Sequence, residues 1–218
     1  DHLVGRVGRL ILVELDDRLV ADLRKRLGGR DDVEIVHADI LSVPLDTVVD
    51  DPTHLLVVGN VPYNITSPII FHLLTRPRPR RIVLMVQKEV AQRITARPGP
   101  DFGALAAGVQ AVAEVKMLFG VPRGVFRPVP GVDSAVIEIV PHDPPRLSES
   151  DEAALRVITR MAFQWRRKQL GRTLRNHPDS PFEREEVDEL AARLGLDLSR
   201  RPETLSISEL LELARASR

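Results

Sequence analysis

Short apolar segments of strand length alternate with segments of helical periodicity over the first 140 residues, and this alternation constrains the fold more than any other feature. The pattern predicts strands over 9–15, 33–36, 54–58, 81–86, 115–119 and 134–140, and helices over 17–27, 68–74, 88–96 and 103–113. Strands that alternate with helices are typical of an α/β fold with a mostly parallel sheet. The last two strands come without a helix between them and are expected to add an antiparallel edge.

Beyond residue 146 the periodicity is helical only. A Pro-rich stretch over 141–146 precedes predicted helices at 152–165, 167–176, 183–194 and 207–216. We therefore predict two domains, an α/β domain over residues 1–143 and a small all-helical domain over residues 144–218.

Composition excludes several classes of protein. The 218 residues include no cysteine, which rules out disulfides and thiolate metal sites and favours a reducing cytoplasm. The six histidines lack the spacing of metal ligands, so no metal is expected. No apolar stretch reaches the roughly 18 residues of a membrane span, and no signal peptide begins the chain.

Charge is balanced in total but uneven along the chain. Lys and Arg together number 31, as do Asp and Glu. Residues 160–175 nevertheless contain six basic side chains and no acid, and a second basic group lies between 76 and 81. Binding of nucleic acid requires a basic face rather than a basic total. Charge alone leaves two interpretations open, an RNA-binding surface or an ordinary solvated face.

A short polar segment, Asn60-Val61-Pro62-Tyr63, follows the apolar run 55–59. The end of a parallel strand is where doubly wound folds bind their ligands. The Asn60 side-chain oxygen and the Val61 carbonyl could accept both N–H bonds of a nucleobase amine and so make that amine more nucleophilic. Pro62 would hold the carbonyl by fixing φ, and Tyr63 offers a ring on which a base can stack. A strand-to-helix turn that contains Asn and Tyr by chance is the alternative.

Three segments closely resemble the ribosomal RNA adenine dimethyltransferases. They are residues 59–68 (GNVPYNITSP), 87–93 (QKEVAQR) and 121–135 (VPRGVFRPVPGVDSA), in the order of that family. The resemblance is strongest to the bacterial enzymes that dimethylate two adjacent adenines near the 3′ end of small-subunit rRNA. It implies a Rossmann-like methyltransferase domain that uses S-adenosylmethionine, with Asn60, Val61, Pro62 and Tyr63 as catalytic residues.

The same resemblance implies roles for further residues. Glu14 would hold the ribose of the donor, and Asp39 its adenine amine, with the Ile40 backbone N–H near the ring and Asn60 close to both substrates. Phe126 would pack on the face of the target base opposite Tyr63. Each role has an alternative that involves no ligand. Glu14 would then be an ordinary acid at a strand end, Asp39 the cap of a turn, and Phe126 a core aromatic.

Three residues of the basic segment, Arg166, Arg167 and Lys168, are the predicted contacts to RNA. Phe163 and Trp165 lie beside them, and because they cannot share one helical face, at least one should pack in the core. Lys88 is a further candidate contact to phosphate. The expected partner is the rRNA of an immature small ribosomal subunit, bound by a monomer.

The chain departs from the family at its beginning. A glycine-rich turn should precede the ribose-binding acid by about 20 residues, but thirteen residues precede Glu14. We therefore expect the first strand, its glycine loop and a basic arm, about 50 residues, to be missing here, and the 218-residue chain alone to be inactive. A non-catalytic ribosome-assembly factor of the same fold and a large-subunit resistance methylase remain as alternatives.

Overall fold

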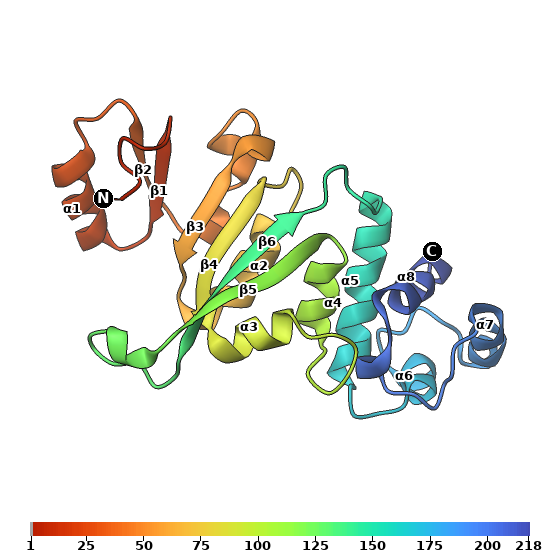
Figure 1. Ribbon diagram of the computed structural model, residues 1–218. Helices are drawn as coiled ribbons and strands as arrows, with labels where there is room; N and C mark the ends of the chain where they lie inside the picture. Colours follow the sequence, from red (N-terminus) through yellow and green to blue (C-terminus); the bar gives the residue numbers. More distant parts are fainter. Residues whose placement is uncertain (1) are drawn as a thin grey trace. The chain divides into compact units, whose positions relative to one another are not determined.

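The computed structural model describes residues 2–218 and divides them into two compact units. The first unit comprises the residues up to 55 together with 65–80, and the second comprises 56–64 together with 81–218. Strands and helices alternate in the first part of the chain, and helices alone make up the C-terminal part (Figure 1). Within the described residues, no helix combines the length and the apolar character that a bilayer span requires.

The first unit contains a small parallel βαβ element. Strand β1 (Leu10–Glu14) leads into helix α1 (Asp17–Leu27), and β2 (Val33–His37) returns beside β1 with Glu14 opposite His37. Asp16 caps α1 by accepting hydrogen bonds from the backbone N–H groups of residues 18 and 19, at 2.8 and 3.1 Å. Because the two strands run in the same direction, the residues that follow them meet at one edge.

Helix α2 (Thr66–Leu73) also belongs to the first unit. The sequence predicted a helix over 68–74, and the helix begins two residues earlier, since it already includes Thr66 and Ser67. A short 3-10 turn, Tyr63–Ile65, precedes it and supplies the change of direction.

The second unit is built on a four-stranded sheet of mixed direction. Its order is β3 (Leu56–Asn60), β4 (Arg81–Gln87), β6 (Ser134–Pro141) and β5 (Ala113–Val121). Strands β3 and β4 are parallel, whereas β6 is antiparallel to both of its neighbours. The predicted antiparallel addition is therefore confirmed, and β6 lies inside the sheet rather than at its edge.

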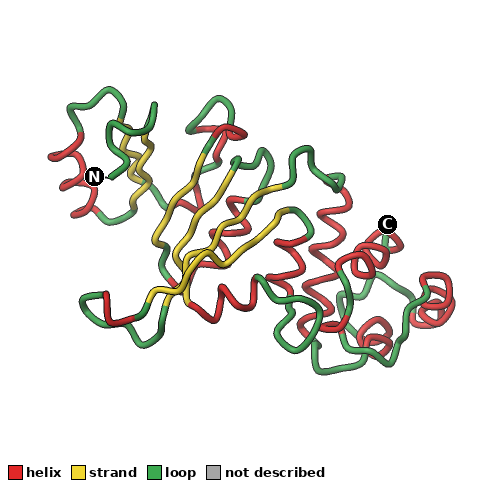
Figure 2. The backbone as a smooth tube through the Cα atoms, viewed as in Figure 1, coloured by secondary structure: helices red, strands yellow, loops and turns green. Residues whose placement is uncertain are grey.

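The two central strands of this sheet, β4 and β6, each have one fully buried face. Alternate residues of β4 and β6, among them Leu84 and Ile137, have exposed fractions of 1% and 0%. Helices α3 (Lys88–Ile94) and α4 (Ala104–Gln110) pack against the sheet (Figure 2). The burial of every second residue is what a strand with one side against helices requires.

The C-terminal part contains helices α5 (Glu149–Gln164), α6 (Leu170–Asn176), α7 (Val187–Leu194) and α8 (Ile207–Ala216). Their buried residues, including Ile158, Leu174 and Leu213, form one core that also takes in Phe102 and the alanines of α4. The helical region thus shares its core with a helix of the α/β part, and a domain boundary at residue 143 stays a prediction.

Ion pairs hold the two ends of the helical region together. Asp151, in the first turn of α5, faces Arg215 at 3.2 Å and Arg218 at 2.9 Å. The hydrogen bond from Arg215 lowers the pKa of the Asp151 carboxyl. The pair therefore stabilises the fold at neutral pH, and its contribution is lost in acid, as the pH falls through that lowered pKa.

Candidate functional site

Glu14 ends β1 with its carboxylate held in place. Its Oε1 atom accepts hydrogen bonds from the backbone N–H groups of Leu15 and Asp16, at 2.8 and 2.9 Å. The second oxygen, Oε2, has no hydrogen-bond or ion-pair partner in residues 2–218. A fixed carboxylate with one unoccupied oxygen can accept hydroxyl groups from a ligand.

Asp39 lies at the same edge as Glu14. The Ala38 N–H donates to the Glu14 carbonyl at 3.1 Å, which joins the ends of the two strands. The Asp39 Oδ1 atom accepts the Leu41 N–H at 2.9 Å and caps the short 3-10 turn Ile40–Ser42. Asp39 therefore does cap a turn, which was the alternative to its role in binding a ligand. The cap occupies one oxygen of Asp39, and Oδ2 has no partner in the described chain.

The Asn60–Tyr63 segment follows β3 in the second unit. Asn60 is the last residue of the strand, opposite Met85, and its exposed side chain has no partner among the described residues. The Tyr63 hydroxyl is 2.6 Å from the Ser134 hydroxyl, which is completely buried. This contact restrains the Tyr63 ring, and the Asn60 amide is left available to a ligand.

Gly59 permits close packing just before this turn. A Cβ atom at residue 59 would lie 3.1 Å from the Leu84 side chain and 3.3 Å from that of Val61. A larger residue would therefore press on the side chains of Leu84 and Val61, and the Val61 carbonyl is a candidate acceptor. Residue type alone gave no role to Gly59 or to Ser134, although both lie in the family-like segments.

Phe126 lies in the turn of residues 122–133 that connects β5 to β6. It is half-buried and does not belong to the buried core, so the core-aromatic alternative is not supported. Asp133 closes the turn: its carboxylate accepts the Arg123 backbone N–H at 3.0 Å, and its carbonyl accepts the Lys88 N–H at 3.0 Å. Ser134, the partner of Tyr63, follows directly.

The predicted residues thus form two groups. Glu14, Asp39 and Ile40 belong to the first unit, whereas Asn60, Val61, Tyr63 and Phe126 belong to the second. No group of three or more His, Asp or Glu side chains suited to a metal ion occurs among residues 2–218.

The three predicted RNA contacts differ in their surroundings. Arg166 pairs with Glu203 at 3.0 Å and also donates to the Pro100 carbonyl, so its charge is used inside the fold. Arg167 and Lys168 are exposed, and their side chains have no partner in the described part of the chain. They lie in a turn after α5, not in a helix as expected.

The neighbouring aromatic residues are packed in different ways. Phe163 makes an edge-on contact with Phe102, with ring centroids 6.0 Å apart, and contacts the core. Trp165 lies against His177, with centroids 5.0 Å apart. The expectation that at least one of the two packs in the core is confirmed for Phe163.

The candidate polar side chains lie at the carboxyl ends of parallel strands, where doubly wound α/β proteins bind their ligands. The Asn60–Tyr63 turn presents hydrogen-bond acceptors beside an aromatic ring, an arrangement suited to a nucleobase amine. The family model described as "Ribosomal RNA adenine dimethylase" matches residues 1–214. The chain belongs to this family of rRNA adenine methyltransferases.

Two curated relatives illustrate the similarity in sequence. The chain is 39% identical over 223 residues to "Ribosomal RNA small subunit methyltransferase A" of Geobacillus kaustophilus, covering 99% of this chain and 76% of the relative. It is 41% identical over 220 residues to the protein of the same name from Geobacter metallireducens, covering 99% and 80%.

Solved structures of the same kind are similar in fold. A dimethyladenosine transferase from Plasmodium falciparum superposes with a TM-score of 0.77 at 25% identity, covering 94% of this chain and 80% of the other. The 23S rRNA methyltransferase ErmE gives a TM-score of 0.67, also at 25% identity, covering 95% and 81%. The expected Rossmann-like methyltransferase fold is confirmed by these comparisons.

Proposed function

We propose that this protein transfers methyl groups from S-adenosylmethionine to N6 of two adjacent adenines near the 3′ end of small-subunit rRNA. We further propose that it acts as a monomer on an immature small subunit in the cytoplasm. One observation carries the proposal: the turn after β3 leaves the Asn60 amide without a partner while Ser134 restrains the neighbouring Tyr63. The names of the curated relatives support the choice of the small subunit.

Residues of the first unit would hold the donor. The Glu14 Oε2 atom would accept the ribose hydroxyls, and the Asp39 Oδ2 atom would accept the adenine amine, beside the Ile40 N–H. Backbone donors already occupy the other oxygen of each carboxylate and orient it. The bound donor supplies a methyl carbon carried on a positively charged sulfur.

Residues of the second unit would prepare the target base. The lone pair of adenine N6 is delocalised into the ring, and N6 must become more tetrahedral to attack. The Asn60 Oδ1 atom and the Val61 carbonyl would accept the two N–H bonds and stabilise the positive charge that develops on nitrogen. Tyr63 and Phe126 would hold the base between them, which requires a base that is flipped out or unpaired.

Primer extension on the rRNAs of a deletion strain tests the target. Dimethylated adenines block reverse transcription, so the strain should lose a pair of stops near the 3′ end of small-subunit rRNA and regain them when the gene is restored. Stops lost from large-subunit rRNA instead would favour the resistance methylase, and unchanged stops on both would favour the non-catalytic assembly factor.

Replacing Glu14 with Gln should weaken donor binding about tenfold or more. Glutamine retains an oxygen for the N–H groups of Leu15 and Asp16 but loses the charge offered to the ribose, and hydrogen bonds to charged groups contribute about 1.5–3 kcal/mol. Titration calorimetry with S-adenosylmethionine, on protein that also carries the expected first strand and glycine loop, measures the change. Glu34→Gln, on the neighbouring strand, is a matched control, and equal affinities in all three proteins would exclude Glu14 from the donor site.

Replacing Phe126 with Ala should weaken capture of the target base by about 1–3 kcal/mol, the usual contribution of one aromatic stacking contact. Because Phe126 lies outside the core, the melting temperature and the affinity for donor should change little. Steady-state kinetics with a small-subunit substrate provide the test. A large loss of thermal stability with unchanged kcat/KM would instead show that Phe126 is a structural residue.

Replacing Arg167 and Lys168 together with Ala should lower RNA affinity and flatten its dependence on salt, by about one to two units of the logarithmic slope. Arg166→Ala breaks the contact to Glu203 and should mainly reduce stability. Filter binding across a salt series separates the two effects. A double variant with the wild-type slope would mean that Arg167 and Lys168 form an ordinary solvated surface.

A further inference from the structure

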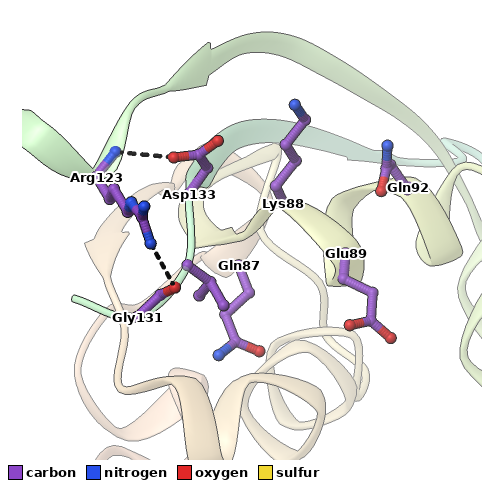
Figure 3. A pocket seen from close by; sticks show the side chains of 8 residues that line it. Gln87, Lys88, Glu89, Gln92, Arg123, Gly131 and Asp133 are labelled. Atoms are coloured by element: carbon purple, nitrogen blue, oxygen red, sulfur yellow. Dashed lines mark hydrogen bonds between the residues drawn. The ribbon is translucent and has the colours of Figure 1, made fainter.

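A polar cavity of about 360 Å³ lies in the second unit, between the start of α3 and the end of the 122–133 turn. Figure 3 shows Gln87, Lys88 and Glu89 on one side of it and Arg123 with Asp133 on the other. Its volume lies near the lower end of the range for small-ligand sites, about 300–1,000 Å³. None of the roles proposed above for the donor and target base uses this cavity.

The cavity adjoins the turn that carries Asn60 and Tyr63. Gln87 ends β4, the strand beside β3, and is paired with Ser134 of β6. Ser134 in turn contacts the Tyr63 hydroxyl at 2.6 Å. One buried residue therefore separates the cavity wall from the ring on which the target base would stack, so that neighbouring nucleotides of one strand could reach both places.

The side chains of the cavity are suited to the edge of an adenine. Gln87 is half-buried, and neither its amide nor the Glu89 carboxylate has a partner within the described residues. Both side chains extend toward the same side in Figure 3. An amide N–H can donate to adenine N7, and the carboxylate can accept from the N6 amine. Guanine presents an acceptor, O6, at that position, which a carboxylate would repel.

The cations of the cavity are suited to the phosphate of the same nucleotide. The Arg123 guanidinium is held by the Gly131 carbonyl at 3.2 Å, and the Arg123 backbone by Asp133 at 3.0 Å. The exposed Lys88 ammonium has no ion-pair partner among residues 2–218. Cations beside Gln87 and Glu89 favour a nucleotide within an RNA strand over a neutral small molecule as the ligand of this cavity.

We infer that this cavity binds the second adenine of the adjacent pair while the first lies against Tyr63. The inference rests on the proposed function and adds a specificity site to it. An adenine neighbour would be selected here by Gln87 and Glu89, so that the enzyme recognises a pair of adenines instead of a single unpaired base.

The test measures methylation of each adenine by mass spectrometry, with immature small subunits that carry either the natural adenine pair or adenine next to guanine. The wild-type protein should prefer the natural pair by about tenfold or more, as expected for a well-formed contact to a base edge. Gln87→Ala and Glu89→Gln should each remove most of that preference. Gln169→Ala, an exposed glutamine remote from the cavity in the sequence, is the control and should behave as wild type.

Melting temperatures of the variants show whether the fold is retained, and titration with S-adenosylmethionine shows whether the donor site is intact. Variants that are folded, bind donor and keep the wild-type preference would overturn the assignment of the cavity. A wild-type protein that carries the expected first strand and glycine loop and still methylates neither adenine would remove the proposed function, and this inference with it. The two failures are distinguishable, because failure of the proposed function is seen with the wild-type protein, whereas failure of this inference is seen only with the variants.

Discussion

Replacing Asn60 with Ala is expected to remove nearly all methyl transfer and to leave the fold intact. Asn60 ends β3, and its exposed side chain has no hydrogen-bond or ion-pair partner in residues 2–218, so its removal breaks no such contact. Loss of a fixed group that stabilises charge in the transition state costs about 2.7–4 kcal/mol, or about 100- to 1,000-fold in kcat. Single-turnover methylation of small subunits measures the effect.

Asn176→Ala is the matched control for this variant. Asn176 is exposed at the end of α6 and donates to the Arg172 carbonyl at 3.0 Å, far along the chain from the catalytic segment. It should retain wild-type turnover. An Asn60→Ala protein with near wild-type kcat would exclude the proposed role for the amide and leave the Val61 carbonyl as the acceptor to examine.

Replacing Ile158 with Ala is expected to cause a large loss of stability. Ile158 is fully buried on α5 in the core that joins the C-terminal helices to α4. Truncating a buried isoleucine to alanine costs about 2–5 kcal/mol, because contacts are lost and a cavity remains. Denaturant unfolding followed by circular dichroism gives the free energy of unfolding.

Val157 is the neighbouring residue on the same helix and is 40% exposed. Val157→Ala should change the free energy of unfolding by less than about 0.5 kcal/mol, as surface substitutions usually do. Similar losses for the two variants would mean that α5 does not bury the face assigned to it. A loss for Ile158→Ala confined to a separate unfolding transition would support an independent helical domain after residue 143.

Local chemistry made several elements predictable from the sequence. Helices α1 and α8 have the predicted bounds, Asp17–Leu27 and Ile207–Ala216, because Asp16 and Ser206 cap their first turns. Strand β3 begins two residues later than expected. The reason is that Pro52–His54 forms a 3-10 turn capped by Asp51, which uses residues that alone look extended.

Long-range contacts explain what the sequence could not predict. The candidate acids and the Asn60–Tyr63 segment were found from residue type and position at strand ends. The Ser134 contact to Tyr63 and the cavity beside Gln87 depend on β6 being placed between β4 and β5. The internal pairing of Arg166 with Glu203 was missed for the same reason, since a basic side chain in sequence gives no sign of a distant acid.

The contact between Tyr63 and Ser134 also bears on the order in which the molecule folds. These two residues are 71 positions apart in the chain. Strand β6, which begins with Ser134, lies between β4 and β5, and both of those strands come earlier in the chain. Contacts of such wide separation form slowly, since a long loop must close before they gain any stability. During synthesis Tyr63 therefore lacks the Ser134 contact until β6 has been made and inserted. A chain interrupted before residue 134 would carry the Asn60 segment but not the support on which its geometry depends.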